Sequence, residues 1–107
     1  MADIVKMYKD AFAMYVSGEL DAAIGAFKQV IEADSEFALA HQGIAEVYAR
    51  LDRLDEAIDA IQRAIDAEPT ESLYYTSLSR FLQRQGKIPE AEAAAADAQR
   101  VQSSGGS

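Results

Sequence analysis

The chain has 107 residues and no cysteine, and its 18 acidic and 10 basic side chains give a formal net charge of -8. This length allows one compact domain or a short array of repeats, and it leaves no room for a large enclosed substrate cavity. The lack of cysteine excludes a disulfide framework and thiolate metal sites. The negative charge argues against nucleic acid and membrane surfaces as partners.

Six helices are predicted, because the apolar residues recur at helical spacing between turn signals at Ser17-Gly18, Leu51-Asp52 and Gln85-Gly86. Ser35 and Thr70 are the expected N-caps of the third and fifth helices. The predicted helices span residues 3–16, 20–34, 36–51, 54–67, 70–85 and 88–102.

Neither end of the chain carries a recognisable targeting signal. A secretory signal has a basic start followed by an apolar run, and a membrane span needs roughly 20 apolar residues; neither pattern occurs. We therefore expect a cytoplasmic protein. Residues 103–107, composed of Ser and Gly, are expected to form a flexible tail.

The sequence repeats itself at a constant spacing. The segment Leu20–Ala26 aligns with Leu54–Ala60, and a degraded third copy begins at Ile88. One position of the repeat, which carries a large residue in the first two copies, is occupied by Phe27, Ile61 and Ala95. Alternating large and small residues at fixed places allow two helices to pack closely.

This helix–turn–helix unit of about 34 residues resembles the tetratricopeptide repeat. The resemblance implies an all-α, right-handed solenoid of three repeats with six antiparallel helices. The domain is expected to cover residues 1–102, with repeats at about 4–37, 38–71 and 72–105. Such arrays act as non-catalytic modules for protein–protein interaction.

Residues that could carry chemistry are scarce. The chain has one His and no Cys, and neither a Ser-His-Asp nor a Cys-His arrangement is apparent. No metal-ligand spacing occurs. We expect neither enzyme activity nor a cofactor nor a metal. His41 is expected to be a packed, hydrogen-bonded core residue, with a pH-sensitive switch as the alternative.

The first helix carries more apolar residues than one interface requires. Beside the stripe of Ile4, Met7, Ala11 and Met14 lies a second stripe, and together they span about 200° instead of the usual 100°. Either the helix is covered on two sides or it presents an aromatic patch to a partner. The second stripe consists of Val5, Tyr8, Phe12, Tyr15 and Val16.

In the resembled family, the first helices of the repeats line a concave groove that binds peptides or helices. This groove is predicted to be aromatic at its N-terminal end and basic at its C-terminal end, so the bound segment is expected to carry an acidic residue. In the alternative, Glu46 neutralises Arg50 and Arg80. The predicted groove residues are Val5, Tyr8, Lys9, Phe12, Tyr15, Gln42, Glu46, Arg50, Leu73, Arg80 and Arg84.

Two further expectations concern partners. Family members that hold chaperone tails use Lys, Asn and Arg side chains at positions that are here Tyr8, Phe12, Gly43, Leu73 and Ser77, which argues against such tails. The last helix is rich in alanine, so the alternative function is a self-associating scaffold or small subunit of a larger assembly, with a homodimer as one outcome. That surface is predicted at Ala91, Ala94, Ala95 and Ala98.

Overall fold

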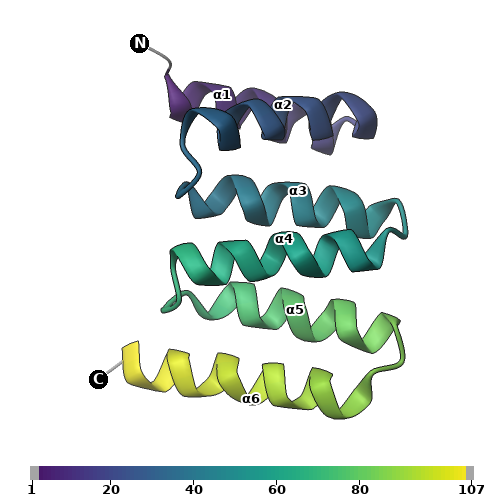
Figure 1. Cartoon of the computed structure of the whole chain (residues 1–107), viewed down its shortest axis with the longest axis vertical. Helices are drawn as coiled ribbons and strands as arrows, with labels where there is room; N and C mark the ends of the chain where they lie inside the picture. Colours follow the sequence, from purple (N-terminus) through teal and green to yellow (C-terminus); the bar gives the residue numbers. More distant parts are fainter. Residues whose placement is uncertain (1–2, 106–107) are drawn as a thin grey trace.

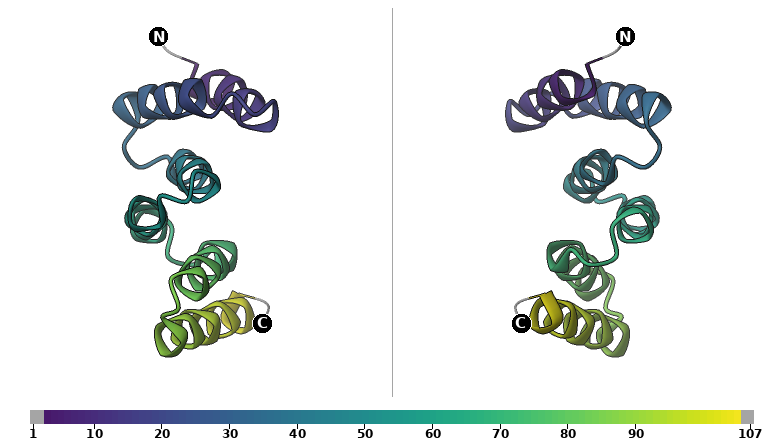
Figure 2. Two further views of the ribbon diagram at one scale, coloured as in Figure 1. Left: turned by 90° about the vertical axis from the view of Figure 1, so that its right-hand side faces the viewer. Right: turned by 90° about the vertical axis from the view of Figure 1, so that its left-hand side faces the viewer.

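The computed structural model describes residues 3–105, which form six α-helices and no strand (Figure 1). Consecutive helices pack against each other, and α1 also contacts α3. Figure 2 shows α1, α3 and α5 along one side of the stack and α2 and α4 along the other. The predicted all-α repeat architecture is confirmed. The helices are α1 (Ile4–Val16), α2 (Leu20–Ala33), α3 (Ala38–Arg50), α4 (Leu54–Ala67), α5 (Ser72–Arg84) and α6 (Ile88–Gly105).

The turn inside each repeat has the same geometry three times. Gly18, Asp52 and Gly86, which occupy the same position in successive repeats, have φ values of 83°, 61° and 78°. After each of them an amide donates to the carbonyl five residues earlier, as in the bond of 2.8 Å from Arg53 to Tyr48. This left-handed closure is the common way to end a helix, and Asp tolerates it better than most residues other than Gly.

Three helix ends differ from the sequence prediction by two residues or more. Phe37 and Glu71, not Ser35 and Thr70, occupy the N-cap positions of α3 and α5. Helix α6 continues to Gly105, so residues 103–105 of the predicted flexible tail are helical, while 106–107 lie outside the described residues. Ser and Gly favour a linker by composition, but a continuing alanine-rich helix overrides this local preference.

The loops between repeats are fastened by a recurring hydrogen bond. His41 Nε2 lies 2.8 Å from the carbonyl oxygen of Ser35, and the Tyr75 hydroxyl donates to the carbonyl of Pro69 at 2.8 Å. Both bonds reach back six residues, from equivalent slots of the second and third repeats. The prediction of a packed, hydrogen-bonded His41 is confirmed, since its side chain is buried.

The core is closely packed where the first repeat meets the second. Phe27 is fully buried, as are Ile61 and Phe81 in later helices. A Cβ placed on Gly43 of α3 would lie 2.5 Å from Cε1 of Phe27. The Phe27 ring therefore rests directly on the backbone of α3, and only glycine leaves room for it.

Candidate partner-binding surface

The side of the stack formed by α1, α3 and α5 carries several exposed apolar side chains. Val5 is 53% exposed, Phe12 43% and Leu73 66%. Monomeric proteins rarely expose contiguous apolar patches without a function. The exposed cations of the same predicted surface are Lys9, Arg50, Arg80 and Arg84.

The aromatic part of this surface is anchored in the core. The Tyr8 ring lies 6.0 Å from Phe27 and 5.7 Å from Phe37, measured between centroids, and 6.1 Å from Phe12. Phe12 in turn lies 5.9 Å from Tyr15. These separations are typical of favourable ring pairs, and burial raises the pKa of Tyr8. The wide stripe of α1 is thus covered in part, because its two tyrosines are half-buried while Val5 and Phe12 remain exposed.

Arg50 extends this row of rings. Its guanidinium carbon lies 4.8 Å from the centroid of the Tyr15 ring, which is cation–π geometry. Its Nη1 also donates to the Tyr15 carbonyl oxygen at 3.2 Å. Within residues 3–105 no carboxylate forms an ion pair with Arg50, so the expectation that Glu46 neutralises it is wrong.

Arg80, in contrast, is neutralised inside the chain. Its two terminal nitrogens donate to the two carboxylate oxygens of Glu46, at 3.2 and 2.9 Å. The Ser77 hydroxyl donates to the same carboxylate at 3.3 Å. The hydrogen bond to Glu46 raises the pKa of Arg80. For Arg80 the expected neutralisation by Glu46 is confirmed.

Arg84 repeats the role of Arg50 one repeat later. Its Nη1 donates to the Ala49 carbonyl at 2.9 Å, and its Nη2 lies 3.2 Å from Oδ1 of Asp52. Arg50 and Arg84 are one repeat apart, as are the two carbonyls of Tyr15 and Ala49 that accept their hydrogen bonds. Each arginine thus fastens the end of one first helix to the next. The spacing of one repeat between Arg50 and Arg84 is visible in the sequence. The sequence prediction nevertheless assigned both arginines to ligand binding.

Two positions on α3 and α5 near the predicted surface are closed to a partner. Gly43 is buried against Phe27, and Ser77 is buried beside Glu46. Both belong to the set compared with chaperone-tail adaptors. Gln42 is half-buried on the same helix, so the accessible surface of α3 is narrower than its sequence spacing suggests.

The predicted self-association surface on α6 is largely wrong. Ala91, Ala94 and Ala98 are buried, and the Ser79 hydroxyl of α5 donates to the Ala91 carbonyl at 2.8 Å. These alanines are the interface between α6 and α5. Of the four predicted residues only Ala95 is exposed, because nothing in the described chain packs on that side of α6.

Among residues 3–105 no group of three or more His, Cys, Asp or Glu side chains lies in a metal-binding arrangement. In the same range no helix has both the length and the apolar character that a membrane crossing requires.

Comparison with known proteins identifies the architecture. The sequence profile of the tetratricopeptide repeat matches residues 17–81. No curated protein matches the sequence.

Solved structures resemble the whole fold at low sequence identity. The type III secretion translocator chaperone SycD of Yersinia enterocolitica has a TM-score of 0.90 and 22% identity, with 94% of this chain and 77% of SycD covered. MamA has a TM-score of 0.92 and 23% identity, with 96% of this chain covered but only 60% of MamA. The second repeat domain of Spaghetti (RPAP3), solved with an HSP90 peptide, has a TM-score of 0.86 and 19% identity, with 92% and 91% covered.

Proposed function

Because the chain belongs to the tetratricopeptide repeat family, whose profile matches residues 17–81, we propose that it is a non-catalytic module for protein–protein interaction. It binds a peptide or helix of a partner protein on the surface formed by α1, α3 and α5. The observation that carries this proposal is the exposed row of apolar and aromatic side chains along α1, centred on Phe12. Two similar structures support it, since SycD was solved with a peptide of the translocator YopD and Spaghetti with an HSP90 peptide.

The aromatic side chains supply the affinity of this surface. Aromatic and arginine side chains that become desolvated dominate the binding energy of most interfaces. Phe12 is exposed but held between the half-buried rings of Tyr8 and Tyr15, so a partner that covers it loses little side-chain entropy. Val5 and Leu73 extend the apolar area on α1 and α5.

The cations of the surface set its preference for charge. Arg80 is already paired with Glu46, and Arg84 donates to Ala49 and Asp52. No ion pair joins Lys9 or Arg50 to a carboxylate within the described chain. An acidic residue of the partner is therefore best placed beside Arg50, at the end of the aromatic row, or beside Lys9.

The proposal is tested with a peptide selected from a random display library on the parent chain. Phe12→Ala is expected to weaken binding of that peptide about tenfold or more, measured by fluorescence anisotropy, because it removes the central anchor. Ile88→Ala is the matched control, since Ile88 is 47% exposed at the start of α6 and lies outside the proposed surface. Equal affinity for parent and Phe12→Ala variant would place the binding site elsewhere.

A self-associating scaffold is the second candidate function, and the description of SycD as an alternative dimer favours it. The exposed side of α6 around Ala95 is the surface that remains for it. Sedimentation equilibrium of the parent and of the Ala95→Arg variant distinguishes the two functions. A dimer that is lost on Ala95→Arg supports the scaffold, and a monomer in both cases opposes it.

A further inference from the structure

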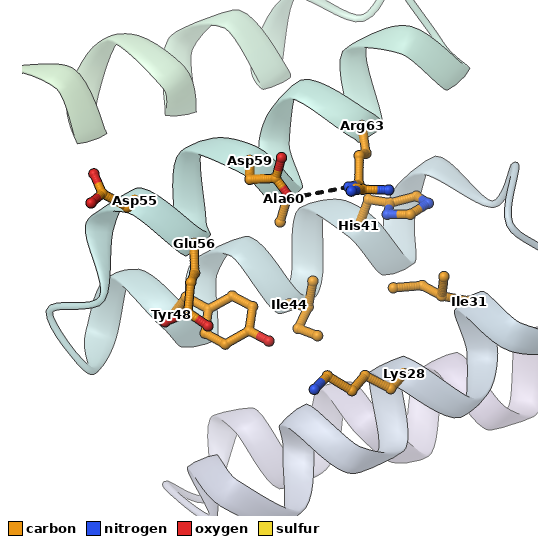
Figure 3. A pocket seen from close by; sticks show the side chains of 10 residues that line it. All are labelled: Lys28, Ile31, His41, Ile44, Tyr48, Asp55, Glu56, Asp59, Ala60 and Arg63. Atoms are coloured by element: carbon orange, nitrogen blue, oxygen red, sulfur yellow. Dashed lines mark hydrogen bonds and ion pairs between the residues drawn. The ribbon is translucent and has the colours of Figure 1, made fainter.

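A cleft of about 450 Å³ opens between α2 and α4, with α3 as its floor. Figure 3 shows His41, Ile44 and Tyr48 of α3 between Lys28 and Ile31 of α2 and a row of charged side chains on α4. Concave sites with an apolar floor and a few polar groups are the usual places for a ligand to bind. The residues of α4 that line it are Asp55, Glu56, Asp59, Ala60 and Arg63.

The cleft lies on the opposite side of α3 from the proposed partner-binding surface. At about 100° per residue, His41, Ile44 and Tyr48 form one stripe of the helix. Glu46 and Arg50 fall on the other side of the same helix. Occupation of one surface therefore does not obstruct the other.

The floor of the cleft suits an apolar side chain. Ile44 and Tyr48 are largely buried, and Ile31 is half-buried at the edge. The cleft is open towards solvent between two helices, so a side chain of a bound segment can enter it.

The walls suit a basic segment. Together with an adjoining lobe of about 350 Å³ that Glu36 and Asp66 also line, the cleft is lined by five carboxylates and by only two cations, Lys28 and Arg63. The carboxylates of Asp55, Glu56 and Asp59 follow one another along α4. The excess negative charge agrees with the net charge of -8 and would accelerate the approach of a cationic partner.

The ion pairs that already exist on this wall are replaceable. Arg63 and Asp59 lie 3.1 Å apart with side chains 64% and 69% exposed, and ion pairs at such exposure add little to the stability of a protein. Arg53 approaches Glu56 to 2.7 Å from outside the cleft lining, and this hydrogen bond lowers the pKa of Glu56. Both carboxylates are partly exposed and thus accessible to a partner's cation.

One polar atom near the cleft remains unsatisfied. His41 Nε2 faces a carbonyl oxygen, which can only accept, so this nitrogen carries the ring proton of the neutral form. The other ring nitrogen, Nδ1, is buried without a hydrogen-bond partner among the described residues. A buried acceptor left in this state is destabilising, and a donor from a bound segment would offset that cost.

We propose that this cleft binds a basic segment of a second partner protein. One apolar side chain of that segment rests on Ile31, Ile44 and Tyr48, and its flanking Lys or Arg side chains face the carboxylates of α4. The domain then has two surfaces of opposite charge preference, and it can hold two partners at the same time.

The test uses a short synthetic peptide with a central Leu flanked on both sides by Lys and Arg, studied at low ionic strength by NMR. We expect its largest shifts at the methyl groups of Ile31 and Ile44. The Glu56→Lys/Asp59→Lys variant should weaken binding about tenfold, because it reverses the wall's charge. The matched control, Glu90→Lys/Glu92→Lys, makes the same charge change at exposed positions on α6 and should change affinity less than about twofold.

Three results would overturn the proposal. The first is equal weakening by both double variants, which indicates non-specific attraction only. The second is a set of peptide-induced shifts centred on α1. The third is a self-association of the chain that Glu56→Lys/Asp59→Lys abolishes, which makes a second copy the occupant. Phe12→Ala should leave this binding unchanged, so failure here and failure of the proposed function are distinguishable.

Discussion

The two junctions between repeats solve the same packing problem with different chemistry. Where α1 and α2 meet α3, aromatic rings meet: the Tyr8 ring of α1 lies 6.0 Å from Phe27 of α2 and 5.7 Å from Phe37 at the start of α3. Where α3 and α4 meet α5, a bidentate ion pair joins Glu46 to Arg80.

One slot of the repeat shows how this difference arises. Phe12, Glu46 and Arg80 are equivalent positions of the three successive repeats. At the second junction the two residues in this position are Glu46 and Arg80, which have opposite charges. At the first junction they are Phe12 and Glu46, which cannot form an ion pair. The slots that define the repeat set where the helices lie, and the remaining positions are free to become apolar or charged.

The residues that meet at the two junctions also differ in size. At the first junction the large Phe27 meets Gly43. At the second, the equivalent positions hold Ile61 and Ser77, both buried. A larger side chain on one helix thus goes with a smaller residue on the other, as constant packing density requires.

The largest effect is expected when the first junction is overpacked. Gly43→Ala should destabilise the chain by about 1–3 kcal/mol, because its Cβ would collide with the buried Phe27 ring. Gly25→Ala is the control, since Gly25 is also helical but has no atom within 4 Å of such a Cβ. It should stabilise α2 by up to about 1 kcal/mol. Urea unfolding followed by circular dichroism measures both changes.

The same substitution in a chain that lacks the Phe27 ring shows whether the ring causes the loss of stability. In a Phe27→Ile variant, which copies the second junction, Gly43→Ala should lose much less stability than in the parent. An equal loss in both backgrounds would mean that Gly43 is required for another reason than the Phe27 ring.

A smaller and salt-dependent effect is expected at the second junction. A double-mutant cycle of Glu46→Ala and Arg80→Ala should give a coupling of about 0.5–1 kcal/mol at low salt. The Glu46 side chain is only 18% exposed, but that of Arg80 is 50% exposed, so solvent screens the pair. The coupling should fall at high salt. The loss of unfolding free energy caused by Phe12→Ala, in contrast, should be the same at every salt concentration. A coupling that salt does not change would contradict the ionic account of this junction.

The smallest change in stability at neutral pH is expected when the hydroxyl of Tyr74 on α5 is removed. Burial, followed by the carboxylates of Glu68 and Glu71, raises the pKa of Tyr74 to about 12, against about 10 in the unfolded chain. The folded state thus favours the neutral hydroxyl, and its contribution is complete below pH 10 and is lost as the pH rises towards 12.

The equivalent residue of the second repeat is the buried Ala40, so Tyr74 contributes its alkaline loss at the second junction. Tyr8, whose pKa burial also raises, contributes a loss of the same sign at the first junction. Tyr74→Phe should unfold less readily than the parent between about pH 10 and 12, measured by urea midpoints across that range. Parallel pH profiles for parent and variant would show that Tyr74 is not responsible.

How much of the binding surface could be predicted is best seen on α1 and α6. On α1 the excess apolar stripe indicated either a second cover or an exposed patch, because the stripe is wider than one interface can cover. Only the structure shows that Phe12 and Val5 are exposed. On α6 almost every side chain is small, so hydrophobic periodicity could not distinguish the inward Ala91 and Ala94 from the outward Ala95.

The sequence by itself determined the local structure of this protein. The constant repeat spacing and the turn signals at Gly18, Asp52 and Gly86 are sufficient to predict six helices in three repeats, because turn geometry and helical periodicity are local properties.

Only the tertiary structure decided what the side chains between repeats do. That Arg50 stacks on Tyr15 while Arg80 pairs with Glu46 depends on how one repeat is rotated against the next. The same holds for the cleft between α2 and α4, whose walls come from two repeats. The spacing of residues along one helix specifies which face they share. The distance between side chains across a junction depends on how two neighbouring repeats pack, so it cannot be predicted from one repeat alone.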